Sequence, residues 1–191
     1  MSPVFASIQN FDIATNFFIA SSIRSAALTP GMILATELGR TVPMTILVLL
    51  VAAVLLSKKL KNDAYFILIV SLGASATTVW LKTVFMRPRP ELALLSEPSF
   101  SFPSGHATAA VAVLGSIALV LYRRSNSKSL RLLIPTLALL VILLLSFSRL
   151  YLGAHYLSDV VAGWVVGGVW LFLGVFIFKN RFVSKQFVTI L

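Results

Sequence analysis

Five long apolar runs, each free of charged residues, constrain this chain more than any other feature. They cover residues 41–56, 64–81, 107–122, 132–147 and 160–178. A helix needs about 17–25 apolar residues to cross a bilayer, so flanking residues must extend the shorter runs. Among 191 residues, 58% are hydrophobic and 12% are charged, which leaves too little polar surface for a water-soluble bundle. The sequence therefore predicts an all-α polytopic membrane protein, a single domain over 1–191 with a transmembrane core over 41–178.

Residues 1–40 also contain apolar stretches, but these are interrupted. The interruptions are Asp12, Asn16, Arg24 and the Pro30-Gly31 pair. Neither half is long enough to cross a bilayer, so we expect two short helices at the membrane interface. The alternative is one irregular span with its break at Thr29-Pro30-Gly31. The expected total is accordingly five to six transmembrane helices.

The distribution of lysine and arginine predicts the orientation. Ten cations lie on one side, in the loops after the first and third runs and in the tail: Lys58, Lys59, Lys61, Arg123, Arg124, Lys128, Arg131, Lys179, Arg181 and Lys185. The other side carries Arg24, Arg40, Lys82, Arg87, Arg89 and Arg149, together with both histidines. Cytoplasmic loops are enriched in lysine and arginine, so the first set is expected in the cytoplasm and the histidines on the outer side.

The net charge of +10 does not indicate a nucleic-acid partner, because most of it lies in these short loops. The chain has no cysteine, which excludes disulfides and thiolate metal sites.

The first of three polar stretches on the outer side follows the second run. It holds Lys82, Arg87 and Arg89, with Pro88 and Pro90 keeping the arginines on a stiff, extended segment. The planar guanidinium donates two parallel hydrogen bonds to a phosphate, and lysine adds a point charge. The alternative is that these cations are interfacial anchors whose side chains extend to lipid headgroups.

The second stretch, around Pro103-Ser104-Gly105-His106, begins the third run. Ser104 is placed to cap the helix, and Gly105 would let backbone N–H groups approach an anion. An ordinary helix start would explain the proline, serine and glycine but not His106.

The third stretch, residues 148–159, joins the last two runs. His155 and Asp159 are spaced i, i+4, which places them on one helix face. A carboxylate on one ring nitrogen fixes the tautomer and leaves the other nitrogen free to attack. The alternative is a salt bridge between Arg149 and Asp159, with His155 filling space.

All three stretches lie at helix ends on the same predicted side, so they can converge although they are distant in sequence. Together they supply cations for the oxygens of a phosphate ester, a nucleophile and an acid for the leaving oxygen. The sequence therefore predicts one phosphate-handling site on the outer side.

The motifs Lys82-x6-Arg89-Pro90, Pro103-Ser104-Gly105-His106 and Ser148-Arg149-x5-His155-x3-Asp159 resemble, in order, the three signatures of the type 2 phosphatidic acid phosphatase family, which is related to the vanadium-dependent haloperoxidases. All eleven fixed positions agree. The resemblance implies a core of that type in a bacterial lipid phosphatase, an integral protein of the inner (plasma) membrane with its site facing the periplasm or cell exterior.

The resemblance also implies residue roles. His155 would be the nucleophile, Asp159 would orient it, and His106 would protonate the leaving oxygen. The phosphate would be held by Lys82, Arg89, Ser104, Gly105 and Arg149. Only Arg89 has the required spacing from Lys82, so we expect Arg87 to contact a lipid headgroup.

We expect no metal and no cofactor. The six acidic residues are scattered along the sequence, and only Asp159 is predicted to belong to the site. The partners expected are the bilayer and a lipid phosphate.

The resemblance suggests four substrates. The favoured substrate is undecaprenyl diphosphate; phosphatidylglycerophosphate, phosphatidic acid and the lipid A phosphates, by hydrolysis or phosphotransfer, are alternatives. A non-catalytic lipid-phosphate binder would not need both histidines and Asp159, and a haloperoxidase would be a soluble bundle binding vanadate.

Residues 91–102 are unusually apolar for a loop. They could rest on the outer leaflet as the lip of the site or pack over the bundle.

Overall fold

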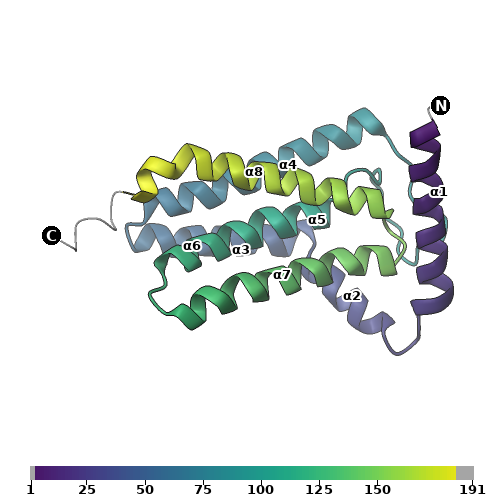
Figure 1. The fold of residues 1–191 in the computed structure, drawn as a ribbon, viewed down its shortest axis with the longest axis horizontal. Helices are drawn as coiled ribbons and strands as arrows, with labels where there is room; N and C mark the ends of the chain where they lie inside the picture. The colour runs from purple at the N-terminus through teal and green to yellow at the C-terminus, as the bar shows by residue number, and fades with distance from the viewer. Residues whose placement is uncertain (1–2, 184–191) are drawn as a thin grey trace.

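The computed structural model describes residues 3–183, with side chains for residues 6–179, and all regular structure within that range is helical (Figure 1). In chain order the elements are α1 (Pro3–Phe18), the π-helical turn η1 (Ile19–Ile23), α2 (Thr29–Leu38), α3 (Thr41–Ser57), α4 (Lys61–Phe85), α5 (Gly105–Ala109), the π-helical turn η2 (Ala110–Leu114), α6 (Gly115–Arg124), α7 (Lys128–Tyr151) and α8 (Leu157–Val183). Each of the five apolar runs lies within helix, which confirms the predicted all-α fold.

Four helical segments are long and apolar enough to cross a membrane: Lys61–Phe85, Gly105–Arg124, Lys128–Tyr151 and Leu157–Lys179. The helices α2 and α3 meet the same criteria only as a pair, bent by 48°. The 17 residues of α3 rise about 26 Å, which is short of the roughly 30 Å hydrocarbon core, so α3 alone does not reach across it. The described part of the chain thus contains four helices that could span a membrane, or five candidates if the bent pair is one span.

The break in the N-terminal segment lies at residues 24–28, and the prediction of a break at Thr29-Pro30-Gly31 is wrong. Those three residues form the first turn of α2. Proline is well suited to that position, because the amide that it lacks would have no partner there. The helix α1 lies across the end of the bundle where α4 and α7 end and α8 begins (Figure 1).

Small residues bring α8 close to the start of the third span. An added Cβ at Gly163 would lie 2.7 Å from the carbonyl oxygen of Ser104, and one at Gly167 would lie 2.8 Å from that of Thr108. Nearer the opposite end, Gly73 of α4 accommodates the ring of Trp170. These contacts fix the N-terminus of α5 against the first turns of α8, where the predicted site residues lie.

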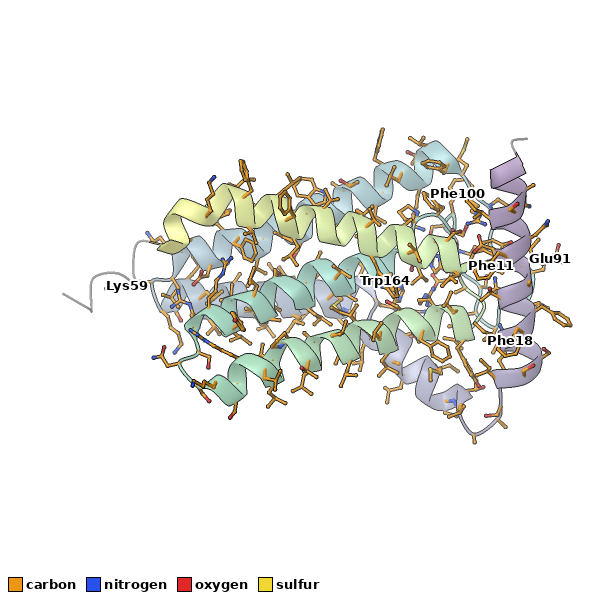
Figure 2. The ribbon with its side chains drawn as sticks, in the orientation of Figure 1. Phe11, Phe18, Lys59, Glu91, Phe100 and Trp164 are labelled. Carbon is orange, nitrogen blue, oxygen red and sulfur yellow. The ribbon has the colours of Figure 1, made fainter. Side chains whose placement is uncertain are left out.

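The two ends of the bundle differ in charge. Lys59 lies at one end, whereas Glu91 and Phe100 lie at the other, beside α1 (Figure 2). Of the predicted cytoplasmic cations, Lys185 and the side chain of Arg181 fall outside the described residues. The described cations of that set flank the ends of α3 and α6, the starts of α4 and α7 and the later part of α8, which lie at the end of the bundle opposite α1 (Figure 1).

Candidate active site

His155 follows a tight reversal of the chain between α7 and α8. Gly153 has φ +67°, in the left-handed region that glycine adopts without strain. A Cβ at Gly153 would lie 2.6 Å from the carbonyl oxygen of Leu92 and 2.5 Å from Nη2 of Arg24. Both the turn and its close contacts therefore require glycine, and the turn sets His155 just before α8.

The imidazole of His155 lies between a cation and a carboxylate. Its Nε2 is 3.4 Å from Nη1 of Arg89, and its Nδ1 is 3.5 Å from Oδ2 of Asp159. Guanidinium only donates hydrogen bonds, so Nε2 is the accepting nitrogen and Nδ1 carries the proton. The Nδ1–Oδ2 distance is long for a hydrogen bond, yet the ring has the orientation that the motif predicted.

The environment of His155 keeps the ring neutral. Only 2% of its surface is exposed. Burial, which disfavours the imidazolium, lowers the pKa of His155 to about 4, although Asp159 acts in the opposite direction. At neutral pH the ring therefore presents an unprotonated Nε2 toward the cations.

Asp159 is fully buried and held by three backbone or side-chain donors. Its Oδ1 accepts from Nη1 of Arg87 at 2.7 Å, and its Oδ2 accepts from the amide of Tyr156 at 2.9 Å. Its carbonyl oxygen accepts from the amide of Ser104 at 2.9 Å. The alternative pairing of Arg149 with Asp159 is wrong, because Arg149 binds Glu97 at 2.7 Å.

Arg87 does not point to a lipid headgroup, and that prediction is wrong. Its Nη1 donates to Asp159 and to Oγ of Ser158, each at 2.7 Å, and its Nη2 donates to Oδ2 of Asp12 at 2.8 Å. Its guanidinium also lies over the ring of Tyr156, 4.1 Å from the centroid. The chain leaves α4 at Met86, with φ 41°, and brings Arg87 against the start of α8 rather than into the bilayer.

The connector between α4 and α5 supplies oxygen ligands to all three predicted phosphate cations. Nε of Arg89 donates to the carbonyl of Ser99 at 2.7 Å, and Nζ of Lys82 donates to the carbonyl of Phe100. Nη2 of Arg149 donates to Glu97. Residues 97–100 thus occupy the donors that a phosphate would need.

Two acidic residues besides Asp159 belong to the site, contrary to the prediction. They are Glu97, on Arg149, and Asp12, on Arg87. Burial acts to raise the pKa of Glu97, but the hydrogen bond and charge of Arg149 outweigh it, and the pKa is below its usual value. Glu97 is therefore a carboxylate at neutral pH. The sequence could have indicated Asp12, because an acidic residue within an apolar stretch usually has a functional or structural partner. No sequence pattern indicated Glu97.

The N-terminus of α5 faces the same region. Ser104 caps the helix, its hydroxyl accepting from the amide of Ala107, and the amides of Gly105 and His106 have no carbonyl of their own helix to bind. A Cβ at Gly105 would meet only Thr78, at 3.8 Å, so the protein leaves this surface open. Nε2 of His106 lies 3.1 Å from the carbonyl oxygen of Thr36, which can only accept. Nε2 therefore carries a proton, and Nδ1 is available for the reaction.

A cavity of about 950 Å³ connects these groups with the apolar interior. Its polar end is lined by Lys82, Arg89, Gly105, His106, Arg149 and His155. Its remaining walls come mainly from α3 and α4, including Met44, Val48, Leu68, Leu72 and Val79. The structure thus brings six of the eight predicted site residues to one cavity. Asp159 and Ser104 lie behind this wall, against His155 and within the helix cap.

Within the described residues, no group of three or more histidine or acidic side chains is arranged to hold a metal ion. The independence of the reaction from metal remains a prediction.

This geometry, cations and a neutral imidazole at the end of an apolar cavity in a membrane bundle, defines a membrane lipid phosphatase, and comparison with known proteins agrees. Residues 64–182 match the family described as the PAP2 superfamily. The chain belongs to that superfamily and is an integral membrane lipid phosphatase.

Two relatives and two solved structures show how far the similarity extends. Phosphatidylglycerophosphatase B of Bacillus subtilis is 31% identical over 156 residues, 79% of this chain and 75% of the relative. The undecaprenyl-diphosphatase of Sulfolobus acidocaldarius is 31% identical over 103 residues, 54% of this chain and 42% of the relative.

Among structures, the PAP2-type phosphatidylglycerolphosphate phosphatase from Bacillus subtilis has a TM-score of 0.85 at 30% identity, covering 95% of this chain and 89% of its own. Aquifex aeolicus LpxE has a TM-score of 0.64 at 22% identity, covering 83% and 92%, and supports the fold alone.

Proposed function

We propose that this protein removes the terminal phosphate of a lipid phosphate through a phosphohistidine on His155. The observation that carries the proposal is the position of the neutral Nε2 of His155, next to Arg89 and at the polar end of a cavity that continues between apolar helices. No other described histidine combines a buried carboxylate behind the ring with a cation in front of it.

The shape of the cavity favours an amphipathic substrate. Phosphate at Lys82, Arg89 and Arg149 leaves the apolar walls of α3 and α4 to contact the lipid chain. A soluble phosphate ester would gain nothing from walls formed by Met44 and Leu72. Large apolar side chains of the connector, Leu92, Leu94 and Phe100, are 41–50% exposed beside the polar end. They suit contact with the outer leaflet, while the hydrogen bond from Leu94 to the carbonyl of Leu152 ties the connector to the bundle.

In the first step, Nε2 of His155 attacks the phosphorus atom, and the bond from phosphorus to the leaving oxygen breaks. The three cations and the amides of Gly105 and His106 stabilise the charge on the non-reacting oxygens. For this step His106 takes up a second proton, at Nδ1, and gives it to the leaving oxygen as the freed lipid alcohol departs. Asp159 stabilises the positive charge that forms on His155.

In the second step, water attacks the phosphohistidine. His106, now neutral at Nδ1, accepts a proton from the water, the P–N bond breaks and inorganic phosphate is released. Each group returns to its starting state, so the cycle needs no external oxidant or metal.

Phosphatidylglycerophosphate is the substrate we propose first. The support is the B. subtilis phosphatidylglycerophosphatase, whose fold covers 95% of this chain at a TM-score of 0.85. The site would act on a single phosphate, which the three cations and one helix N-terminus are enough to hold.

Undecaprenyl diphosphate is the second candidate. Its support is the Sulfolobus relative, which is equally identical but over a shorter part of the chain. Either substrate would be met in the outer leaflet of the inner membrane if the cationic end faces the cytoplasm, and we propose that orientation from the cation distribution.

The test is phosphate release by purified protein from a panel containing phosphatidylglycerophosphate, phosphatidic acid and undecaprenyl diphosphate, with chelator present. We expect turnover in chelator, abolished by His155→Ala, with the highest kcat/KM on phosphatidylglycerophosphate. A higher kcat/KM on undecaprenyl diphosphate would select the second candidate. Full turnover by His155→Ala would contradict the mechanism, and loss with chelator that magnesium restores would contradict metal independence.

A further inference from the structure

The N-terminal helix α1 contributes a buried carboxylate to the site. Asp12 is 1% exposed although it lies in a helix that crosses the end of the bundle (Figure 1). Its Oδ1 accepts from the amide of Ser158 at 2.9 Å, and its Oδ2 accepts from Nη2 of Arg87 at 2.8 Å and from the hydroxyl of Ser158. A buried carboxylate is costly unless it is paired, and these donors pair it completely.

Arg87 connects this carboxylate to Asp159. One arm of its guanidinium, Nη2, binds Asp12, and the other, Nη1, binds Oδ1 of Asp159 at 2.7 Å. The ring of Tyr156 packs on the guanidinium face and limits its movement. The other carboxylate oxygen, Oδ2, is left to face Nδ1 of His155 and the amide of Tyr156.

We infer that Arg87 and Asp12 are positioning residues for the phosphatase reaction: Asp12 anchors Arg87, and Arg87 fixes the rotation of the Asp159 carboxylate so that Oδ2 faces His155. Arg87 lines the cavity beside Arg89, but its two terminal nitrogens are bound to the carboxylates of Asp159 and Asp12, so we assign it no direct contact with the substrate. The inference rests on the proposed roles of His155 and Asp159, and it makes α1 a part of the active site rather than only a membrane anchor.

The geometry separates this role from that of the phosphate cations. Arg89, only two residues away, points to Nε2 of His155, the attacking side of the ring. Arg87 acts on the Nδ1 side, through Asp159. Loss of Arg89 should weaken anion binding, whereas loss of Arg87 should leave anion binding intact and slow the chemical step.

The experiment compares Arg87→Gln, Arg87→Lys, Asp12→Asn and the Arg87→Gln/Asp12→Asn double variant in purified full-length protein. The readouts are kcat, KM and the inhibition constant of inorganic phosphate. The control is Arg124→Gln, which removes another ion-paired arginine, bound to Asp63 near the opposite end. His155→Ala reports on the proposed function itself.

We expect Arg87→Gln and Asp12→Asn to lower kcat by about 10- to 100-fold, as loss of a group that orients a catalytic residue usually does. The inhibition constant of phosphate should change by less than about threefold, and Arg87→Lys should recover part of kcat. Because Asp12 acts through Arg87, Asp12→Asn should have no further effect in the Arg87→Gln background. Arg124→Gln should keep wild-type kinetics.

Wild-type kcat in both single variants, with His155→Ala inactive, would overturn the inference and leave the proposed function intact. Weaker phosphate inhibition with unchanged kcat would also overturn it, because Arg87 would then be an anion ligand. Full activity of His155→Ala would instead contradict the proposed function. If Arg87→Gln does not fold, Arg87→Lys and Asp12→Asn decide by the same criteria.

Discussion

Nη1 of Arg89 lies 3.4 Å from Nε2 of His155, although the two residues are 66 positions apart in the chain. The guanidinium is therefore near enough to bind an oxygen of a phosphate that the imidazole attacks, and the proline on each side of Arg89 keeps its backbone extended. Cation and nucleophile are therefore close together before substrate arrives, although Arg89 must exchange its present ligands, the carbonyl oxygens of Ser99 and Ala154, for phosphate oxygens.

The proposed acid, His106, can be tested through the leaving group. His106→Asn should slow hydrolysis of a lipid phosphate by about 100-fold or more, because an alkoxide is a poor leaving group without a proton donor. On p-nitrophenyl phosphate, whose leaving oxygen needs no proton, the same variant should lose far less activity. Equal losses on both substrates would show that His106 holds the phosphate rather than protonating the leaving group.

The protonation state of His155 can be observed directly, because the chain has only two histidines. In tag-free His106→Asn protein, a nitrogen-labelled imidazole belongs to His155 alone. With its pKa lowered to about 4 by burial, the ring should stay neutral from pH 7.5 to 5.5 and charge only as the pH falls toward 4. NMR signals that titrate near pH 6.5 would mean that the ring is solvated.

Glu97 should compete with the substrate for Arg149. Glu97→Gln removes a negative charge beside the anion site, so the inhibition constant of inorganic phosphate should fall by roughly three- to tenfold, a modest effect because the carboxylate is partly solvated. Glu91→Gln, an exposed position in the same connector, is the matched control and should change nothing. A higher inhibition constant in Glu97→Gln would show that Glu97 supports Arg149 rather than competing with phosphate.

The orientation can be tested with two serine-to-cysteine variants, since the native chain has no cysteine. Ser96 is exposed in the connector beside the site, and Ser57 is exposed at the opposite end. An impermeant thiol reagent added to intact cells should label Ser96→Cys and not Ser57→Cys. The reverse pattern would place the site in the cytoplasm. Ser101 lies in the same connector but is fully buried, so a cysteine at that position would not react with the reagent.

Much of this site was predictable from sequence because its parts have local signatures. Charge-free runs locate the spans, and a capping serine before glycine marks the start of α5. The spacing of His155 and Asp159 predicted one helix face, which is wrong because His155 precedes α8, yet the two side chains still lie 3.5 Å apart. All three motifs are predicted at helix ends on the same side of the membrane, so they can converge on one site. None of these arguments needs knowledge of which helices pack together.

The contacts that were missed depend on tertiary packing alone. The motif spacing distinguishes Arg89 from Arg87, but nothing in the sequence places Arg87 on Asp159; the left-handed residue Met86, just before Arg87, turns the chain toward α8. Asp12 and Thr36 come from the N-terminal helices, whose path over the bundle has no periodic signal, and Glu97 is an isolated acid in a loop. Such partners are set by the packing of distant segments.

The most direct test of the central claim is to trap the phosphoryl group. Purified protein is mixed with lipid substrate carrying radioactive terminal phosphate, quenched in alkali within milliseconds, and digested for peptide mapping. We predict an alkali-stable, acid-labile label on the peptide containing His155 in wild-type protein and none in His155→Ala. If fully active protein releases phosphate but His155 carries no label at any quench time, the mechanism is contradicted.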